Sequence, residues 1–161
     1  MENAMEINIR YWTRDDLSEI LGAWLRSCRH APRSDMRLKS DAEEAMMHWL
    51  LSRFKEFSAF GFVAQQDRVF AGFLVGRIDR WESVPPVIEP RKLGIIDAVY
   101  VTEEFRRQGI ASRLIDRALM AMRECNADAV ETIYDFSDAG SAETWRRAGF
   151  VPWMVHAYRM L

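Results

Sequence analysis

The sequence predicts an α/β fold of the α+β type, in which about four helices flank a mixed β-sheet. Two observations carry this prediction. Apolar patterns along the chain give the order β-α-α-β-β-β-α-β-α-β, which is typical of layered α/β domains. One long helix also joins two strands, and a crossover of that length favours a parallel pair. With 161 residues, 49% of them hydrophobic, we expect one domain over residues 1–161, with its core at about 5–161.

The N-terminal elements follow from hydrophobic periodicity. Alternating residues predict a first strand over 7–11. Apolar residues at i, i+3, i+4 and i+7 then predict a helix that begins at Thr13. Ser40 and Glu43 have the spacing of a capping box, so a second helix is expected to start there.

The middle of the chain changes to β-forming residues. Residues 60–65 and 69–78, separated by a short polar segment, are typical of a hairpin. Residues 93–101 form an apolar run interrupted only by Asp97, which predicts a buried strand.

The C-terminal third alternates helices and strands. A helix is expected over 108–126, a strand over 129–136 and a short helix over 138–148, which ends at Gly149. Residues 151–160 are expected to form a last strand.

Composition narrows the class of protein. The 22 Lys and Arg nearly balance 24 Asp and Glu, so no net field favours nucleic acid. No apolar stretch approaches the ~20 residues of a membrane span, and the N-terminus has no signal-peptide pattern. The two cysteines lie in no CxxC or Cys/His cluster. We therefore expect a cytoplasmic protein with no membrane, nucleic-acid or metal partner.

The most informative segment is the turn between strand 93–101 and the next helix. Arg106 and Arg107 precede Gly109 and Ala111, which stand where the helix begins. A helix start offers unpaired amides and a favourable dipole, so small residues there can admit a phosphate. The pattern also arises by chance, because glycine is common. It is neither a Walker A loop nor a three-glycine dinucleotide fingerprint.

This turn resembles the (R/Q)-x-x-G-x-(G/A) signature of the GNAT superfamily of N-acetyltransferases. A second segment, Trp145-Arg146-Arg147-Ala148-Gly149-Phe150, resembles the family's Y-x-x-x-G-F hallmark. The resemblance implies a splayed central sheet that holds acetyl-CoA, with the pyrophosphate at the turn. It further implies direct transfer of the acetyl group to a primary amine of a small molecule or peptide, by a monomer or homodimer.

Family resemblance also implies the site residues. Backbone amides near Tyr100 and Val101 are expected to orient the thioester, and one would donate to the developing oxyanion. The residues expected at the cofactor are Val99, Tyr100, Val101, Arg106, Arg107, Gln108, Gly109, Ile110, Ala111, Ser112, Asp138, Ser141 and Trp145. Asp138 fits equally well as the N-cap of the last helix, and Trp145 fits packing better than chemistry.

A base must accept the proton of the attacking amine. Asp97 is the first candidate, because strand alternation puts it on the face of Ile95, Val99 and Val101; the alternative is that it pairs with an arginine. Glu131, with Asp135 on the same strand face, is the second candidate.

The family's general acid, a tyrosine, is replaced here by Trp145. Tyr134 or Tyr100 is a possible substitute; otherwise the thiolate leaves unassisted.

Two other functions stay open at this point. The missing tyrosine permits a catalytically weak acyl-CoA-binding module that serves as a sensor or partner, and an unrelated nucleotide-binding α/β protein is also possible. The acidic residues Asp97, Glu131, Asp135 and Asp138 hint at a cationic acceptor.

Overall fold

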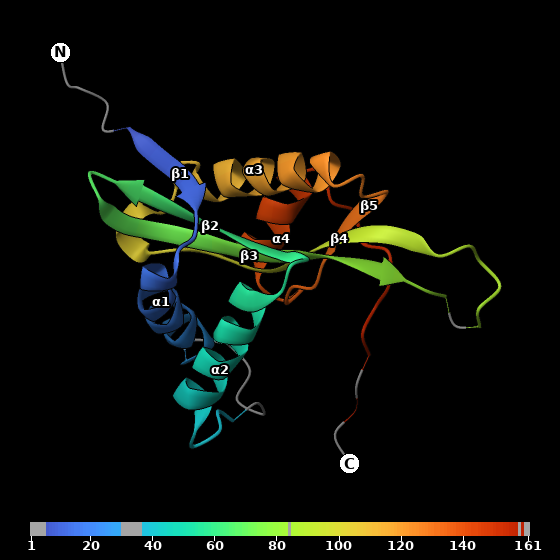
Figure 1. The fold of residues 1–161 in the computed structure, drawn as a ribbon, viewed down its shortest axis with the longest axis horizontal. Helices are drawn as coiled ribbons and strands as arrows, with labels where there is room; N and C mark the ends of the chain where they lie inside the picture. Colours follow the sequence, from blue (N-terminus) through green and yellow to red (C-terminus); the bar gives the residue numbers. More distant parts are fainter. Residues whose placement is uncertain (1–5, 30–36, 84, 158, 160–161) are drawn as a thin grey trace.

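The protein folds around one five-stranded sheet with helices on both faces (Figure 1). The structure is a computed structural model, which describes residues 6–29, 37–83, 85–157 and 159. Its strands are β1 (Ile7–Tyr11), β2 (Ala59–Gln66), β3 (Val69–Trp81), β4 (Arg91–Val101) and β5 (Ala129–Thr132). Its helices are α1 (Leu17–Arg29), α2 (Ala42–Lys55), α3 (Ile110–Glu124) and α4 (Ala139–Arg147), with short 3-10 turns η1 (Arg14–Asp16) and η2 (Glu103–Phe105). None of the helices described is long and apolar enough to cross a membrane.

The sheet has the mixed topology that the element order predicts. Strands β1 to β4 pair antiparallel in sequence order. Strand β5 pairs parallel to β4, after the crossover through α3. This parallel ladder is short, and its last pair is Ile96 with Thr132. Beyond that pair β4 continues to Val101 without β5 beside it, so one edge of β4 is open there.

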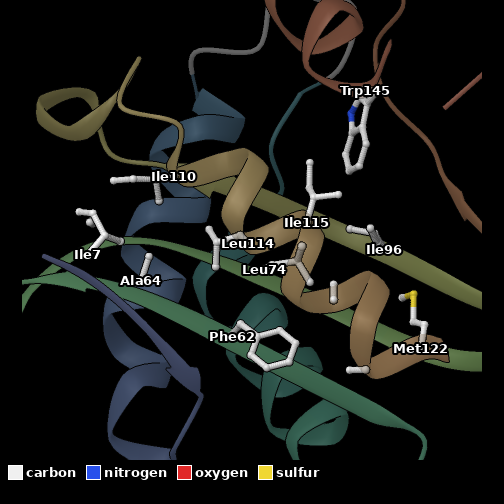
Figure 2. Close-up of a cluster of buried hydrophobic side chains, with 13 residues drawn as sticks. Ile7, Phe62, Ala64, Leu74, Ile96, Ile110, Leu114, Ile115, Met122 and Trp145 are labelled. Carbon is white, nitrogen blue, oxygen red and sulfur yellow. The ribbon is translucent and has the colours of Figure 1, made fainter. Parts of the chain in front are cut away.

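Two hydrophobic cores hold the layers together. On one face α3 and α4 pack against the sheet, and Figure 2 shows Leu114, Ile115 and Met122 of α3 around Leu74 and Ile96. On the other face α1 and α2 cover β2 and β3 through a second cluster. The buried members of that second cluster are Leu17, Ile20, Leu21, Ala23, Leu25, Leu50, Val63, Phe73 and Val75.

Three features of the predicted secondary structure are wrong. Strand β5 ends at Thr132 instead of 136, and Ile133 and Phe136 are about three-quarters exposed. Residues 151–157 form no strand. They make no β-ladder with another strand, and Pro152 has no amide to donate to one. Helix α2 starts at Ala42 with Asp41 as its N-cap, so Ser40 lies one residue too early for the expected capping box.

A carboxylate fixes the turn between β1 and α1. Asp16 is only 5% exposed and accepts hydrogen bonds from Arg10 at 2.7 and 2.8 Å, and from the backbone amide of Thr13 at 2.6 Å. Burial raises the pKa of Asp16, but these hydrogen bonds outweigh burial and hold the pKa below its usual range. Asp16 therefore ties β1 to the start of α1 as an ionised carboxylate.

Candidate active site

The turn before α3 has the geometry of an anion site. Gly109 is the N-cap of α3 with φ +76°, and a Cβ placed on it would meet nothing within 4 Å. Within the described part of the chain, the amides of residues 109 to 112 donate to no acceptor. Four such amides, at the positive end of a 15-residue helix, form a surface that suits a phosphate.

The cations beside this turn are placed differently. Arg106 donates from Nε to the carbonyl of Val101 at 3.1 Å, and its guanidinium lies over the ring of Tyr100 at 5.7 Å. Arg107 is exposed and has the positive φ of 60° that the turn requires. Gln108 donates to the carbonyl of Glu104 at 3.4 Å. Arg106 therefore shapes the turn, while Arg107 presents a charge at its rim.

The open edge of β4 carries unpaired amides. Thr102 donates its amide to Ala71, on the β3 side, at 3.0 Å. Because successive amides of a strand point to opposite sides, those of Val101 and Val99 point away from β3, into the gap left by β5. The amide of Tyr100 points to β3. Of the two residues expected to orient the thioester, Val101 thus offers a donor to the gap and Tyr100 does not; Val99, which was expected at the cofactor, offers a second donor.

A β-bulge changes the face on which Asp97 lies. Val75 is opposite Ala98 and Gly76 is opposite Ile96. The backbone of Asp97 therefore has no residue opposite it in the register of β3. The extra residue reverses the alternation. Val99 and Val101 pack into the core beside α3, whereas Asp97 lines a pocket on the α2 side. The prediction that these three side chains share a face is wrong.

Asp97 is enclosed by arginines. Its carboxylate pairs with Arg77 of β3 and lies 3.9 Å from Nε of Arg53 of α2. Arg53 also pairs with Glu56, and Arg77 lies 3.5 Å from Asp79. Burial lowers the pKa of Arg77, but the hydrogen bond and charge of Asp97 raise it above its ordinary value. The structure thus shows the arginine pairing considered for Asp97, in a five-residue network that links α2, β3 and β4.

The pocket over Asp97 is mainly apolar. It has a volume of about 420 Å³ and is lined by Trp24, Met46 and Trp49, with Arg37 and Lys39 also on its wall. The rings of Trp24 and Trp49 meet edge to face at 5.3 Å. The pocket lies between the start of α2 and β4, close to the point where β4 and β5 part.

Glu131 lies on the other side of that point. It is opposite Ile95 in the parallel ladder, one residue before the last pair. Glu131 lines a second pocket, of about 240 Å³, with Trp81, Leu93 and Trp153. Within the described residues Glu131 forms no ion pair and accepts no side-chain hydrogen bond. Glu131 is therefore the carboxylate near the open edge of β4 that has no ion-pair partner in the described chain.

The aromatic residues of the second motif are structural. Trp145 is 3% exposed and packs on Phe150 at 5.1 Å and Tyr134 at 6.4 Å (Figure 2 shows Trp145 above the α3 core). This burial agrees with a packing role and leaves little of the indole available to a cofactor. Tyr134 is half-buried in the same core. That its hydroxyl acts as the general acid stays a prediction. Gly149 has φ +86°, as a helix C′ residue requires.

Two more acidic residues are used in local structure. Asp138 accepts from the amides of Gly140 at 3.0 Å and Ser141 at 3.3 Å, and so is the N-cap of α4. Asp135 accepts from the amide and hydroxyl of Ser137 in a turn, because β5 has already ended. With Asp97 paired to arginines, Glu131 alone of the four acids remains without a partner in the described chain, so the basis for a strongly negative cleft is removed.

Sequence reasoning missed several residues around the site. Arg77 and Arg53 were not identified, since only the sheet register and the docking of α2 bring them to Asp97. Trp81 and Trp153, whose rings lie 5.5 Å apart, come from segments far apart in the chain. Their aromatic character was visible in the sequence, but nothing local indicated that they meet.

Comparison with known proteins identifies the family. A model of the acetyltransferase (GNAT) family matches residues 15–150. The chain is 31% identical over 125 residues to an uncharacterized N-acetyltransferase of Archaeoglobus fulgidus, which covers 78% of this chain and 80% of that protein. It is 28% identical over 109 residues to an N-alpha-acetyltransferase of Sulfurisphaera tokodaii, covering 64% of this chain and 63% of the relative, or somewhat less than two thirds of its length.

Solved structures share the fold. An aminoglycoside N-acetyltransferase in complex with CoA superposes with a TM-score of 0.79 over 99% of this chain and 98% of its own, at 16% identity. At that identity the likeness shows the fold alone. The family match, the splayed mixed sheet and the open turn before α3 lead to one conclusion: the chain belongs to the GNAT acetyltransferase family.

Proposed function

We propose that the protein is an acetyl-CoA-dependent N-acetyltransferase that acts on the primary amine of a small molecule or peptide. The observation that carries the proposal is the set of amides over residues 109 to 112 that find no acceptor among the described residues, at a turn where Gly109 leaves the approach open. These amides suit the diphosphate of coenzyme A, and Arg107 adds a charge at the rim. The open edge of β4 would then receive the pantetheine arm and bring the thioester to Val99 and Val101.

The reaction needs little from side chains. The amine nitrogen bonds to the thioester carbon, and the amides of Val99 and Val101 would stabilise the oxyanion that develops. The carbon–sulfur bond then breaks and the thiolate departs. A thiol's ordinary acidity, with a pKa of ~8.5, makes it an adequate leaving group without a general acid. This accounts for a family member that has Trp145 where others have tyrosine.

Glu131 is the better candidate for the base. The proton lost by the amine requires an acceptor with a free lone pair within reach of the thioester. Asp97 is paired with Arg77 and lies beside Arg53, so two guanidinium groups stand between its carboxylate and an incoming amine. Glu131 has no such partner in the described chain and lies one residue from the end of the parallel ladder. We therefore rank Glu131 ahead of Asp97.

The alternative function is an acyl-CoA-binding sensor or partner module. It shares the turn before α3 with the enzyme but requires no amine transfer. Release of free thiol from acetyl-CoA, measured with a panel of amines, separates the two. Acetylated product identified by mass spectrometry supports the enzyme, whereas tight CoA binding without product from any amine supports the module.

The cofactor site itself is tested with a matched pair of glycines. Gly109 and Gly149 both have positive φ, and at both positions an added Cβ would meet open space, but only Gly109 lies at the α3 turn. Each Gly→Ala change strains the backbone by about 1 kcal/mol. We expect Gly109→Ala to weaken CoA binding at least about tenfold in titration calorimetry, equal to roughly 1.4 kcal/mol. Gly149→Ala should leave it unchanged; equal affinities for both variants would contradict the proposed site.

A further inference from the structure

The pocket beside Glu131 has opposite charges at its two ends. Its walls are Trp81, Leu93 and Trp153, with Ala129 and Val130 on β5, and its volume is about 240 Å³. Glu131 and Arg91 are the charged residues that line it. Two of its lining residues, Trp81 and Arg91, pair with each other in the β3–β4 hairpin, which extends beyond β5 in Figure 1. We call it the Trp81/Trp153 pocket.

Strand register sets the order of these residues. Glu131 is opposite Ile95, Ala129 is opposite Leu93, and Arg91 is opposite Trp81 on β3. Arg91 thus lies four residues along β4 from the row of Glu131, or about 13 Å at ~3.3 Å per residue. Glu131 is at the inner end, near the open edge of β4, and Arg91 is at the outer end, with apolar side chains between them.

Neither charge has a partner in the part of the chain that the structure describes. Within the residues the structure describes, Arg91 and Glu131 form no ion pair with each other or with another side chain. The tryptophan rings stand 5.5 Å apart and add a mainly apolar surface that carries no charge. A complementary ligand would have an ammonium group at one end, an anionic group at the other, and an apolar middle.

We propose that this pocket binds the acceptor and that the acceptor is a short apolar peptide with a free C-terminal carboxylate. This rests on the proposed acetyl transfer. The N-terminal amine lies at Glu131, next to the thioester; an apolar side chain packs against Trp81 and Trp153; and the carboxylate pairs with Arg91. An extended tripeptide spans about 10 Å at ~3.3 Å per residue, which matches the separation of the charges once the arginine side chain reaches inward.

The same charges select against polycationic amines. A polyamine or aminoglycoside would place a second cation near Arg91, or near Arg37 and Lys39 in the pocket over Asp97. Like charges that are brought close together repel one another. These pocket charges therefore argue against an aminoglycoside acceptor for this chain, although its fold is similar to that of an aminoglycoside N-acetyltransferase.

The test compares trileucine with its C-terminal amide, and both with spermidine. Turnover is followed by thiol release from acetyl-CoA, and binding is measured separately by calorimetry in the presence of CoA, so that a catalytically silent protein is also informative. Arg91→Ala removes the proposed partner of the carboxylate. Lys92→Ala is its matched control, since Lys92 is the adjacent cation, directed to the opposite face of β4 and absent from the pocket lining.

We expect the wild-type protein to prefer trileucine over its amide by about tenfold or more in kcat/KM and in binding, since a hydrogen bond between two charged groups is stronger than one to a neutral amide. Arg91→Ala should abolish this preference and Lys92→Ala should keep it. Turnover with equal use of acid and amide, or with spermidine preferred, would overturn the inference and leave the acetyltransferase proposal intact. Selective peptide binding without turnover would support the pocket and count against the enzyme; binding without selectivity would overturn the pocket.

Discussion

Asp97 and Glu131 flank the same point of the sheet, where β4 and β5 part, yet they differ in every contact. Asp97 belongs to a network with Arg77 and Arg53 and is 15% exposed as a side chain. Glu131 has no charged partner in the described chain and opens into a pocket. The comparison teaches that Asp97, the acid that stands alone in an apolar stretch of sequence, has a structural role. A carboxylate without an ion-pair partner, such as that of Glu131, is available for chemistry, even though the sequence pattern draws more attention to Asp97.

The largest expected effect comes from breaking the Asp97 network. Asp97→Asn removes the charge that two partly buried arginines share. Removing one partner of a buried pair costs about 3–5 kcal/mol, and we expect the lower end of that range because Asp97 is partly exposed. The measurement is the free energy of unfolding in urea.

A double-variant cycle sharpens this result. If the pair is what stabilises the fold, Asp97→Asn combined with Arg77→Gln should lose less than the sum of the single losses, because the second change removes a charge that is already unpaired. Additive losses, or a loss below ~0.5 kcal/mol for Asp97→Asn, the range of ordinary surface changes, would show that the network does not hold α2 to the sheet.

Asp16 is a second partnered carboxylate, far from the cleft, and gives a smaller, pH-dependent effect. Its folded-state pKa lies below the ordinary value of 3.8, so its ionised form stabilises the folded protein. That stability is complete above about pH 4 and is lost as the pH falls through the lower, folded-state pKa. Asp16→Asn should cost roughly 1.5–3 kcal/mol at pH 7, typical of hydrogen bonds to a charged group.

The pH series is the check. Unfolding free energies of the wild type and Asp16→Asn should converge as the pH is lowered below about 4, because the wild-type carboxyl then becomes neutral too. A difference that stayed constant from pH 7 to pH 3 would mean that the variant acts through packing rather than charge.

Local patterns predicted much of the fold. Periodicity gave the helices and most strands, and the single long crossover correctly indicated the parallel pair. The turn before α3 could be predicted because its signal is local: a glycine at a helix start needs no distant partner to adopt positive φ.

The features that the sequence could not reveal depend on contacts between residues that lie far apart in the chain. The bulge at Asp97 inserts one residue into β4, and an alternation rule has no means to detect it. Residues 151–157 have the composition of a strand but find no partner edge in the structure. Arg77 reaches Asp97 only through strand register, and Trp153 meets Trp81 only through the path of the C-terminal segment.

The most direct test of the central claim is the rate of acetyl transfer by Glu131→Gln and Asp97→Asn under saturating acetyl-CoA and acceptor. If Glu131 accepts the proton, Glu131→Gln should lower kcat by about 10²–10⁴-fold, the usual contribution of general base catalysis, while its unfolding free energy stays within ~0.5 kcal/mol of wild type. Asp97→Asn, measured where it remains folded, should retain most of its rate. Full activity in Glu131→Gln together with a large loss in folded Asp97→Asn would contradict the account and return the role of base to Asp97.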